Sequence, residues 1–125
     1  MQISFIGAGK VGVSLGKYFI SKGRKVGGYY SLSPESAASA AKFTNTKQYN
    51  SLEEIISSSD MIFFTVPDDC ISEVWEAAKP YAHEKIIAHC SGIHSSSIFS
   101  DIERQSITSL QKFNIISWNM SHFFF

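Results

Sequence analysis

Cysteine is scarce in this sequence, and long hydrophobic runs are absent from it. The two cysteines, Cys70 and Cys90, are too few for a disulfide framework and too far apart for a C-x-x-C pair. The longest apolar stretches, such as Met61 to Val66, are far shorter than the roughly 20 residues of a membrane-spanning helix. The first residues also lack the pattern of a signal peptide. These absences favour a cytoplasmic protein with no membrane partner.

The formal net charge is zero at pH 7, because 11 basic and 11 acidic residues cancel. A neutral chain has no overall basic field, so we expect no nucleic-acid partner. The charge is nevertheless unevenly placed, since Glu35 is the first acidic residue. An anion would meet a favourable surface in the segment before it, which contains Lys10, Lys17, Lys22, Arg24 and Lys25. Lys17 and Lys22 also fit a solvated helix face.

Apolar segments of strand length alternate with segments of helical period along the 125 residues. This alternation predicts an α/β fold with a mainly parallel sheet of about five strands and helices on both faces, in three α/β/α layers. The expected strands are 2–6, 25–31, a short one near 46–50, 61–66 and 85–90. Helices are expected in the four segments between them: before Gly23, after a Ser33 cap and Pro34, after the Ser51 and Glu54 capping box, and between Pro67 and Pro80.

A glycine motif lies between the first expected strand and helix. Residues 7–12 read Gly7, Ala8, Gly9, Lys10, Val11, Gly12, which is the pattern G-x-G-x-x-G. In a dinucleotide-binding loop, the first glycine allows the tight turn, the second admits the pyrophosphate and the third lets the helix pack closely on the sheet. The phosphates would bind the free N–H groups at the positive end of the helix. We predict dinucleotide binding at residues 7–12, the alternative being a loop whose glycines serve packing alone.

The residue that closes the second expected strand bears on which nicotinamide cofactor binds. An Asp or Glu at this place holds the ribose hydroxyls of NAD and repels the extra phosphate of NADP. Here the residue is Ser31, followed in the same loop by Ser33, and the loop contains no arginine. The missing carboxylate favours NADP, with NAD as the alternative.

Four segments together resemble a known group of proteins. They are the N-terminal FIGAGKVG, the YSLSPESA at the end of the second strand, the SDMIFFTVPDD of 59–69 and the HCSG of 89–92. The sequence resembles the Rossmann-like domain of the deazaflavin-dependent NADP reductase, pyrroline-5-carboxylate reductase and β-hydroxyacid dehydrogenase group. It is most similar to an uncharacterised bacterial family in which this domain precedes a helical C-terminal domain.

The resemblance implies further site residues. Val66, Pro67 and Asp68 would line the nicotinamide-ribose side of the cleft, and Ser91 and Gly92 would contact substrate or cofactor. Parallel strands place such residues at one edge of the sheet, where ligands of open α/β folds bind. At least one of Asp68 and Asp69 is also expected to cap the following helix.

The resemblance extends to about residue 103, so we expect a dinucleotide-binding domain at 1–103 and a tail at 104–125. The tail shows no clear period apart from a strand near Ile107 or Ile115. It does not resemble the family's continuation, where the catalytic lysine of β-hydroxyacid dehydrogenases lies, so we expect a truncated or frame-shifted end. Its aromatic residues are costly to expose and favour a homodimer: Trp118, Phe123, Phe124 and Phe125.

The expected function is that of the NADP(H)-binding domain of an oxidoreductase, with no catalysis by this chain alone. A non-catalytic dinucleotide-sensing or interaction module is the alternative. A methyltransferase that uses S-adenosylmethionine is disfavoured, because such an enzyme would need an acidic residue at the position of Ser31 to bind the ribose. No metal site is expected at His89, Cys90 and His94, because neighbouring strand residues point to opposite faces. Cys70 is not expected to be a reactive thiol, since the sequence places no base beside it.

Overall fold

The protein is described from a computed structural model that covers residues 1–66, 68–91 and 114–119. Its strands form one six-stranded sheet in the order β3-β2-β1-β4-β5-β6, and every neighbouring pair is parallel. The strands are β1 (Gln2–Ile6), β2 (Lys25–Tyr30), β3 (Lys47–Gln48), β4 (Met61–Phe64), β5 (Ile86–Ser91) and β6 (Asn114–Asn119). The helices are α1 (Lys10–Ser21), α2 (Pro34–Thr44), α3 (Leu52–Ser57), α4 (Asp68–Ala78) and the short 3-10 helix η1 (Lys79–Tyr81).

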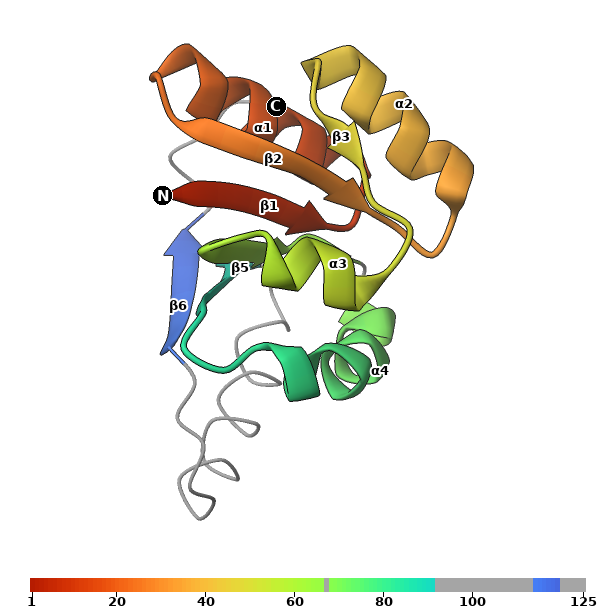
Figure 1. Cartoon of the computed structure of the whole chain (residues 1–125), viewed down its shortest axis with the longest axis vertical. Helices are drawn as coiled ribbons and strands as arrows, with labels where there is room; N and C mark the ends of the chain where they lie inside the picture. Colours follow the sequence, from red (N-terminus) through yellow and green to blue (C-terminus); the bar gives the residue numbers. More distant parts are fainter. Residues whose placement is uncertain (67, 92–113, 120–125) are drawn as a thin grey trace.

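The strand order reverses direction between β1 and β4. From β1 the chain runs outward to β2 and β3, and it then crosses back to place β4 on the other side of β1 (Figure 1). In open parallel sheets this reversal leaves a crevice beyond the carboxyl ends of the two central strands. A ligand site is therefore expected beyond the carboxyl ends of β1 and β4.

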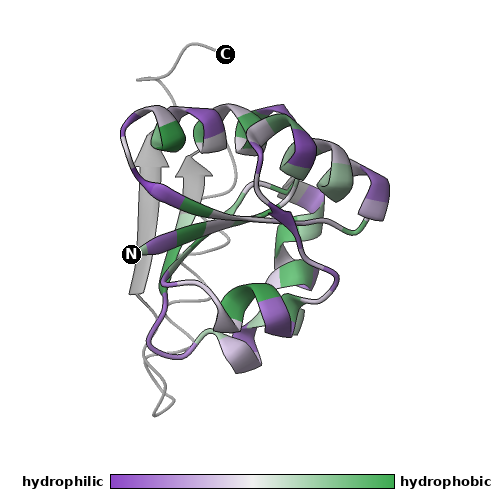
Figure 2. Cartoon of the chain, turned by 45° about the horizontal axis from the view of Figure 1, so that its top comes forward, coloured by the Kyte–Doolittle hydropathy of each residue, from purple (hydrophilic) through white to green (hydrophobic). Residues whose placement is uncertain are grey.

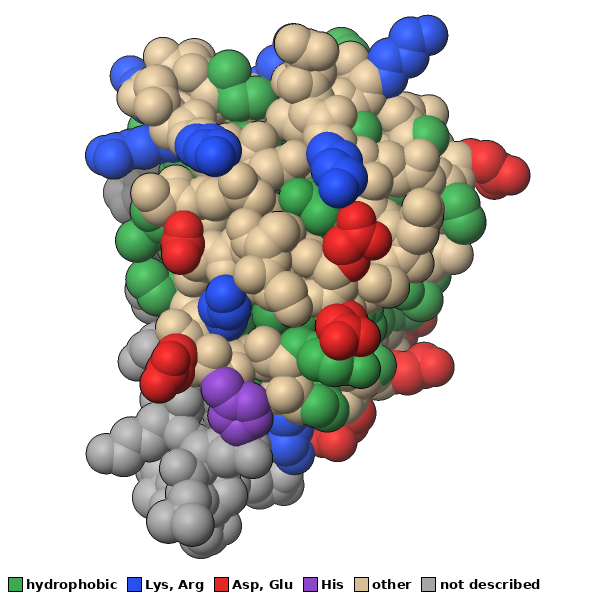
Figure 3. Space-filling view, viewed as in Figure 1, with side chains coloured by type: hydrophobic (Ala, Val, Ile, Leu, Met, Phe, Trp, Pro, Cys, Tyr) green, Lys and Arg blue, Asp and Glu red, His purple; other side chains and the backbone are tan. Residues whose placement is uncertain are grey.

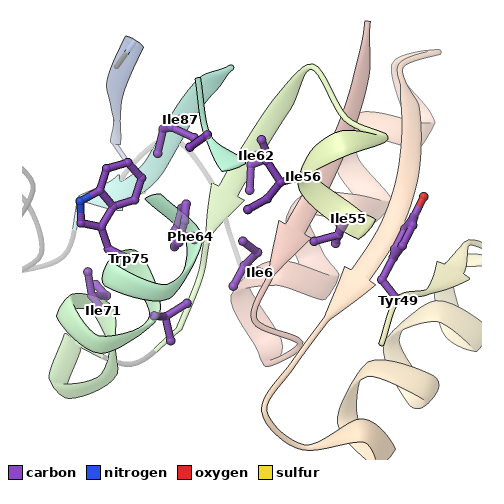
Figure 4. Packing of buried hydrophobic residues seen from close by; sticks show 12 residues of the cluster. Ile6, Tyr49, Ile55, Ile56, Ile62, Phe64, Ile71, Trp75 and Ile87 are labelled. Atoms are coloured by element: carbon purple, nitrogen blue, oxygen red, sulfur yellow. The ribbon is translucent and has the colours of Figure 1, made fainter. Parts of the chain in front are cut away.

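Two hydrophobic cores lie on the two faces of the sheet, because successive strand residues point to opposite sides. On one face Phe5 and Phe63 pack against α1 and α2 through Leu15 and Ala37. On the other face the strands pack against α3 and α4, with Trp75 fully buried, and Figure 4 shows this cluster. Hydrophobic and hydrophilic residues alternate along the helices (Figure 2), as expected for elements that cover a sheet with one side. The prediction of three α/β/α layers is confirmed.

Local sequence signals explain where the helices begin. The Ser33 hydroxyl oxygen accepts a hydrogen bond from the Ser36 backbone N–H, and Pro34 is the first residue of α2. At α3 the Ser51 hydroxyl oxygen accepts from the Glu54 N–H at 3.1 Å, which confirms half of the predicted capping box. The Glu54 carboxylate instead forms an ion pair of 3.2 Å with Lys47.

Two details differ from the sequence-based expectations. The second strand ends at Tyr30, so Ser31 is the first loop residue. The sheet has six strands and not five, because β6 pairs with β5 along its length and contains Ile115. A strand near Ile107 falls outside the described residues. Within the described ranges, no helix is both long enough and apolar enough to cross a membrane.

Candidate functional site

The loop between β1 and α1 is held by backbone hydrogen bonds to both neighbouring strands. The Gly7 N–H donates to the Tyr30 carbonyl oxygen at 2.8 Å, and the Thr65 N–H donates to the Ile6 carbonyl oxygen at 2.9 Å. Gly7 has a φ of +113°, which side-chain-bearing residues rarely adopt. The loop thus begins with a turn that only glycine makes without strain.

Thr65, the residue after β4, lies directly beneath this loop. Its hydroxyl donates to the Gly7 carbonyl oxygen at 3.0 Å. A Cβ at Gly7 would meet the Thr65 carbonyl carbon at 2.7 Å, and a Cβ at Gly12 would meet the Thr65 Oγ1 at 2.7 Å. Close contact with Thr65 therefore explains two of the three glycines by packing alone.

Gly9 has no such structural reason. It is the N-cap residue of α1 and has an extended backbone conformation, with φ −82° and ψ −170°. Among the described residues, no atom lies within 4 Å of the position that a Cβ at Gly9 would occupy. The N-terminal end of α1 receives no side-chain cap, and the first turn of this helix has no acidic residue. The missing side chain leaves the free N–H groups of this helix end open to approach, which is the geometry that anions bind.

A cleft of about 420 Å³ opens at this edge of the sheet. It lies at the crevice between β1 and β4 and is formed by the loops that follow β1, β2 and β4. Its lining residues are Gly7, Ala8, Gly9, Lys10, Val11, Ser31, Leu32, Ser36, Thr65, Val66 and Cys70. Three loops far apart in the sequence thus share one cavity.

The structure brings most of the sequence-predicted site residues to this cleft. Those that line it are Gly7, Ala8, Gly9, Lys10, Val11, Ser31 and Val66. Gly12 is buried in the first turn of α1. Ser33 caps α2 and does not line the cavity.

The remaining predicted residues lie at or beyond the limit of the described part of the chain. Pro67 and Gly92 fall outside the described residues. Ser91 is placed only as the last residue of β5, and Asp68 only as the first residue of α4. The helix begins at Asp68, so Asp69 lies in its first turn, where its charge complements the positive helix end.

Four lining residues were not predicted from the sequence: Leu32, Ser36, Thr65 and Cys70. Leu32 follows Ser31 in the loop and is 65% exposed at the rim of the cavity. Thr65 could have been found from its place at the end of a buried strand, one residue before Val66. Ser36 and Cys70 enter the cleft from the first turns of α2 and α4, and their inclusion depends on how the helices sit on the sheet.

The hydroxyl groups after β2 are linked in a short series of hydrogen bonds. The Ser31 Oγ accepts from the Ser33 N–H at 3.2 Å, and the Ser33 Oγ accepts from the Ser36 N–H at 3.4 Å. The Ser36 hydroxyl also donates to the Ser33 Oγ at 3.2 Å. These bonds shape the loop into the start of α2 and hold Ser31 at the cleft.

The thiol of Cys70 is not activated. Burial and the neighbouring Asp69 carboxylate raise the pKa of Cys70 above its usual value, and Glu73 adds to the effect. A raised pKa lowers the fraction of thiolate at neutral pH. The expectation that Cys70 is not a reactive thiol agrees with this direction.

The N-terminal part of the chain matches a family model. Residues 2–91 match the family described as NADP oxidoreductase, coenzyme F420-dependent. No curated protein matches the sequence.

Solved structures with the same fold are numerous and distant in sequence. A Bacteroides fragilis protein assigned as an NADP oxidoreductase is 23% identical with a TM-score of 0.65, over 72% of this chain and 35% of its own. A Desulfitobacterium hafniense protein assigned as an NADPH-dependent oxidoreductase is 23% identical with a TM-score of 0.69, over 90% of this chain and 34% of its own. An imine reductase from Bacillus cereus is 11% identical with a TM-score of 0.75, over 93% of this chain and 39% of its own. The chain therefore spans between about a third and two fifths of the length of these proteins.

Proposed function

The chain belongs to the family described as NADP oxidoreductase, coenzyme F420-dependent, and on that premise we propose that its cleft binds NADP(H), with NAD(H) as the alternative cofactor. The observation that carries the proposal is the empty space where a Gly9 side chain would lie, beside the N-terminal end of α1, which has no side-chain cap. Packing explains Gly7 and Gly12 but leaves Gly9 without a reason. A pyrophosphate on the α1 N–H groups supplies that reason.

The cleft divides naturally into places for the parts of a dinucleotide. The pyrophosphate would lie over residues 7–12, and the adenosine ribose would lie at Ser31 and the loop to Ser33. Val66, Pro67 and Asp68 would face the nicotinamide ribose, with Ser91 and Gly92 on the same side. This assignment follows the order in which the strand ends meet at the carboxyl edge of the sheet.

The chemistry of hydride transfer would come from the nicotinamide ring, and the residues of this chain would bind and orient it. Among the residues that line the cleft in the described part of the chain, Lys10 and Cys70 are the titratable ones. Lys10 lies at the glycine loop, and the raised pKa of Cys70 makes its thiolate scarce. We therefore propose that residues 1–103 form a binding domain, and that proton transfer to a substrate needs groups beyond this cleft.

Calorimetric titration of the purified chain with NADP+ and with NAD+ tests the binding. We expect saturable binding of both, tighter for NADP+. A flat titration with both cofactors, on protein shown by circular dichroism to be folded, would overturn the proposal. Saturable NADP+ reduction with added hydroxy acids, or saturable NADPH oxidation with added imines or ketones, would contradict the part that denies catalysis by this domain alone. In the absence of such turnover, a dinucleotide-sensing module stays the alternative.

We also propose that the chain forms a homodimer. The support is the aromatic composition of its last residues, of which Trp118 lies in the edge strand β6 and Phe123 to Phe125 fall outside the described residues. Sedimentation equilibrium should report a species heavier than 13.9 kDa, and removal of 120–125, which spares β6, should shift it toward the monomer. A soluble monomer before truncation would refute the dimer.

A further inference from the structure

Lys10 stands out among the residues that line the cleft because it is the one cation in the described lining. It is the first residue of α1 and is exposed. The other lining residues are glycines, apolar side chains, hydroxyl groups and one thiol. The choice between NADP and NAD turns on a phosphate that carries nearly two negative charges, so the position of a single cation matters.

Lys10 lies between two adjoining cavities. Besides the cleft, a groove of about 520 Å³ lies between α1 and α2, and Lys10 lines both. In the groove it shares the walls with Ser39 and Phe43 of α2, and in the cleft it shares them with Ser31 and Ser36. Lys10 therefore lies where the glycine loop adjoins α2, at a position shared by both cavities.

Among the described residues, no recorded ion pair occupies this cation. The two ion pairs recorded in the described residues, Lys47 with Glu54 and Lys79 with Glu76, do not involve it. Glu35, in the first turn of α2, lines neither the cleft nor the groove. Lysine and arginine side chains gather over the part of the molecule formed by α1 and β2, whereas most carboxylates lie toward α3 and α4 (Figure 3). An anion between α1 and α2 would meet the ammonium group of Lys10.

We propose that the Lys10 ammonium group contacts the 2′-phosphate of NADP and is the residue that selects NADP over NAD. This inference rests on the proposed binding of a dinucleotide in the cleft. The loop after β2 contains no arginine to hold the phosphate, and its hydroxyls at Ser31 and Ser36 supply hydrogen bonds without charge. The cation comes instead from the glycine loop, across the cleft from these hydroxyls. Its four-carbon stem gives the ammonium group the reach that this geometry requires.

Binding of NADP+ and NAD+ to Lys10→Met, measured by calorimetry at one fixed ionic strength, tests the proposal. Methionine keeps the length and apolar stem of the side chain and removes the charge. Because a charge-assisted contact is lost, we expect the affinity for NADP+ to fall about tenfold and that for NAD+ to change less than about twofold. Lys10→Arg should keep the preference for NADP+.

Lys17→Met is the matched control. Lys17 lies two turns further along α1, lines neither cavity and stacks over the Phe43 ring with its Nζ 4.4 Å from the ring centre. The control loses the same charge from the same helix, so it measures the effect of the general field around α1. We expect it to leave both affinities within about twofold of those of the unchanged protein. An equal loss of NADP+ affinity in Lys17→Met would overturn the assignment to Lys10.

The remaining outcomes separate this inference from the proposed function. If Lys10→Met weakens NADP+ and NAD+ equally, the ammonium group serves the pyrophosphate, and the inference fails while dinucleotide binding stands. No change for either cofactor likewise overturns it. If the unchanged protein binds neither cofactor, both the inference and the proposed function fail. Adenosine 2′,5′-bisphosphate and ADP isolate the phosphate in question, because only the first should lose affinity in Lys10→Met.

Discussion

The hydroxyl of Tyr29 donates a hydrogen bond of 2.8 Å to the carbonyl oxygen of Gly12. Tyr29 is fully buried in the middle of the sheet and stacks on Phe5 with ring centres 5.1 Å apart. Gly16 lies one turn beyond Gly12, and a Cβ at Gly16 would overlap the Tyr29 hydroxyl oxygen. The Tyr29 side chain of β2 thus sets how closely α1 approaches the sheet. It thereby also fixes the position of the glycine loop that precedes α1.

This contact predicts a strong coupling between Gly16 and Tyr29. Gly16→Ala alone should lower the free energy of unfolding by about 1–3 kcal/mol, because the new methyl group overpacks the core. In a Tyr29→Phe background the nearest remaining atom is the ring Cζ at 3.2 Å, and alanine is favoured over glycine in a helix by about 1 kcal/mol. The cost of Gly16→Ala should therefore fall by at least about 1 kcal/mol in that background.

Urea denaturation of the four proteins in this cycle measures the coupling. Gly9→Ala serves as the control, since its Cβ would occupy open space. An equal cost of Gly16→Ala with and without the Tyr29 hydroxyl would contradict the contact.

Tyr29 also predicts a dependence of stability on high pH. Burial raises the pKa of Tyr29 well above its usual value near 10. The unfolded chain loses this proton at lower pH than the folded protein, so the stabilisation is complete below about pH 10 and is lost as pH rises toward the folded pKa. Above pH 10 the unfolding free energy should fall by about 1.4 kcal/mol per pH unit more in the unchanged protein than in Tyr29→Phe. Urea denaturation at pH 9 and pH 11 checks this, and parallel curves for the two proteins would show that Tyr29 does not contribute.

The two glycines Gly9 and Gly12 should respond differently to the same substitution. Gly9→Val should fold normally and lose dinucleotide binding, because its side chain enters only the space reserved for the pyrophosphate. Gly12→Val should lose stability, by about 1–3 kcal/mol or more, because its side chain would meet Thr65 Oγ1 and the Gly7 carbonyl oxygen within 2.8 Å. Thermal denaturation and calorimetry on both variants separate the two effects. Unchanged cofactor affinity in Gly9→Val would mean that the loop only turns the chain.

Ser31→Asp should reverse the cofactor preference. The unchanged protein is expected to favour NADP+ about tenfold, equivalent to roughly 1.4 kcal/mol. An aspartate can still accept the hydrogen bond from the Ser33 N–H that the Ser31 Oγ accepts at 3.2 Å, so the loop should keep its shape. Its carboxylate would repel the 2′-phosphate and accept from the ribose hydroxyls of NAD+.

Competition binding of both cofactors to both proteins measures this reversal. The two affinities should move in opposite directions. If both fall equally in Ser31→Asp, then Ser31 does not contact the adenosine ribose.

Much of the fold could be predicted because its signals are local. The buried strand Met61–Phe64 is a continuous apolar run, and Ser33 with Pro34 marks the start of α2 in three residues of sequence. The match at residues 2–91 confirms the family resemblance that the four quoted segments carried. β6 was harder to predict, because its residues become a strand through pairing with β5 and carry no clear period of their own.

For the candidate site, the sequence by itself determined the glycine loop and Ser31, which lie at the ends of recognisable strands, and the family resemblance supplied Val66. Only the tertiary structure decided the reasons for the individual glycines, because these depend on the register of β4 beside β1, which puts Thr65 beneath Gly7 and Gly12. The same holds for Lys10, whose motif predicts phosphate contact but not which phosphate. The packing of α2 next to α1 places Lys10 in one cavity with Ser36 and in another with Ser39, and distances between helices are set by side chains in the core that no local pattern contains.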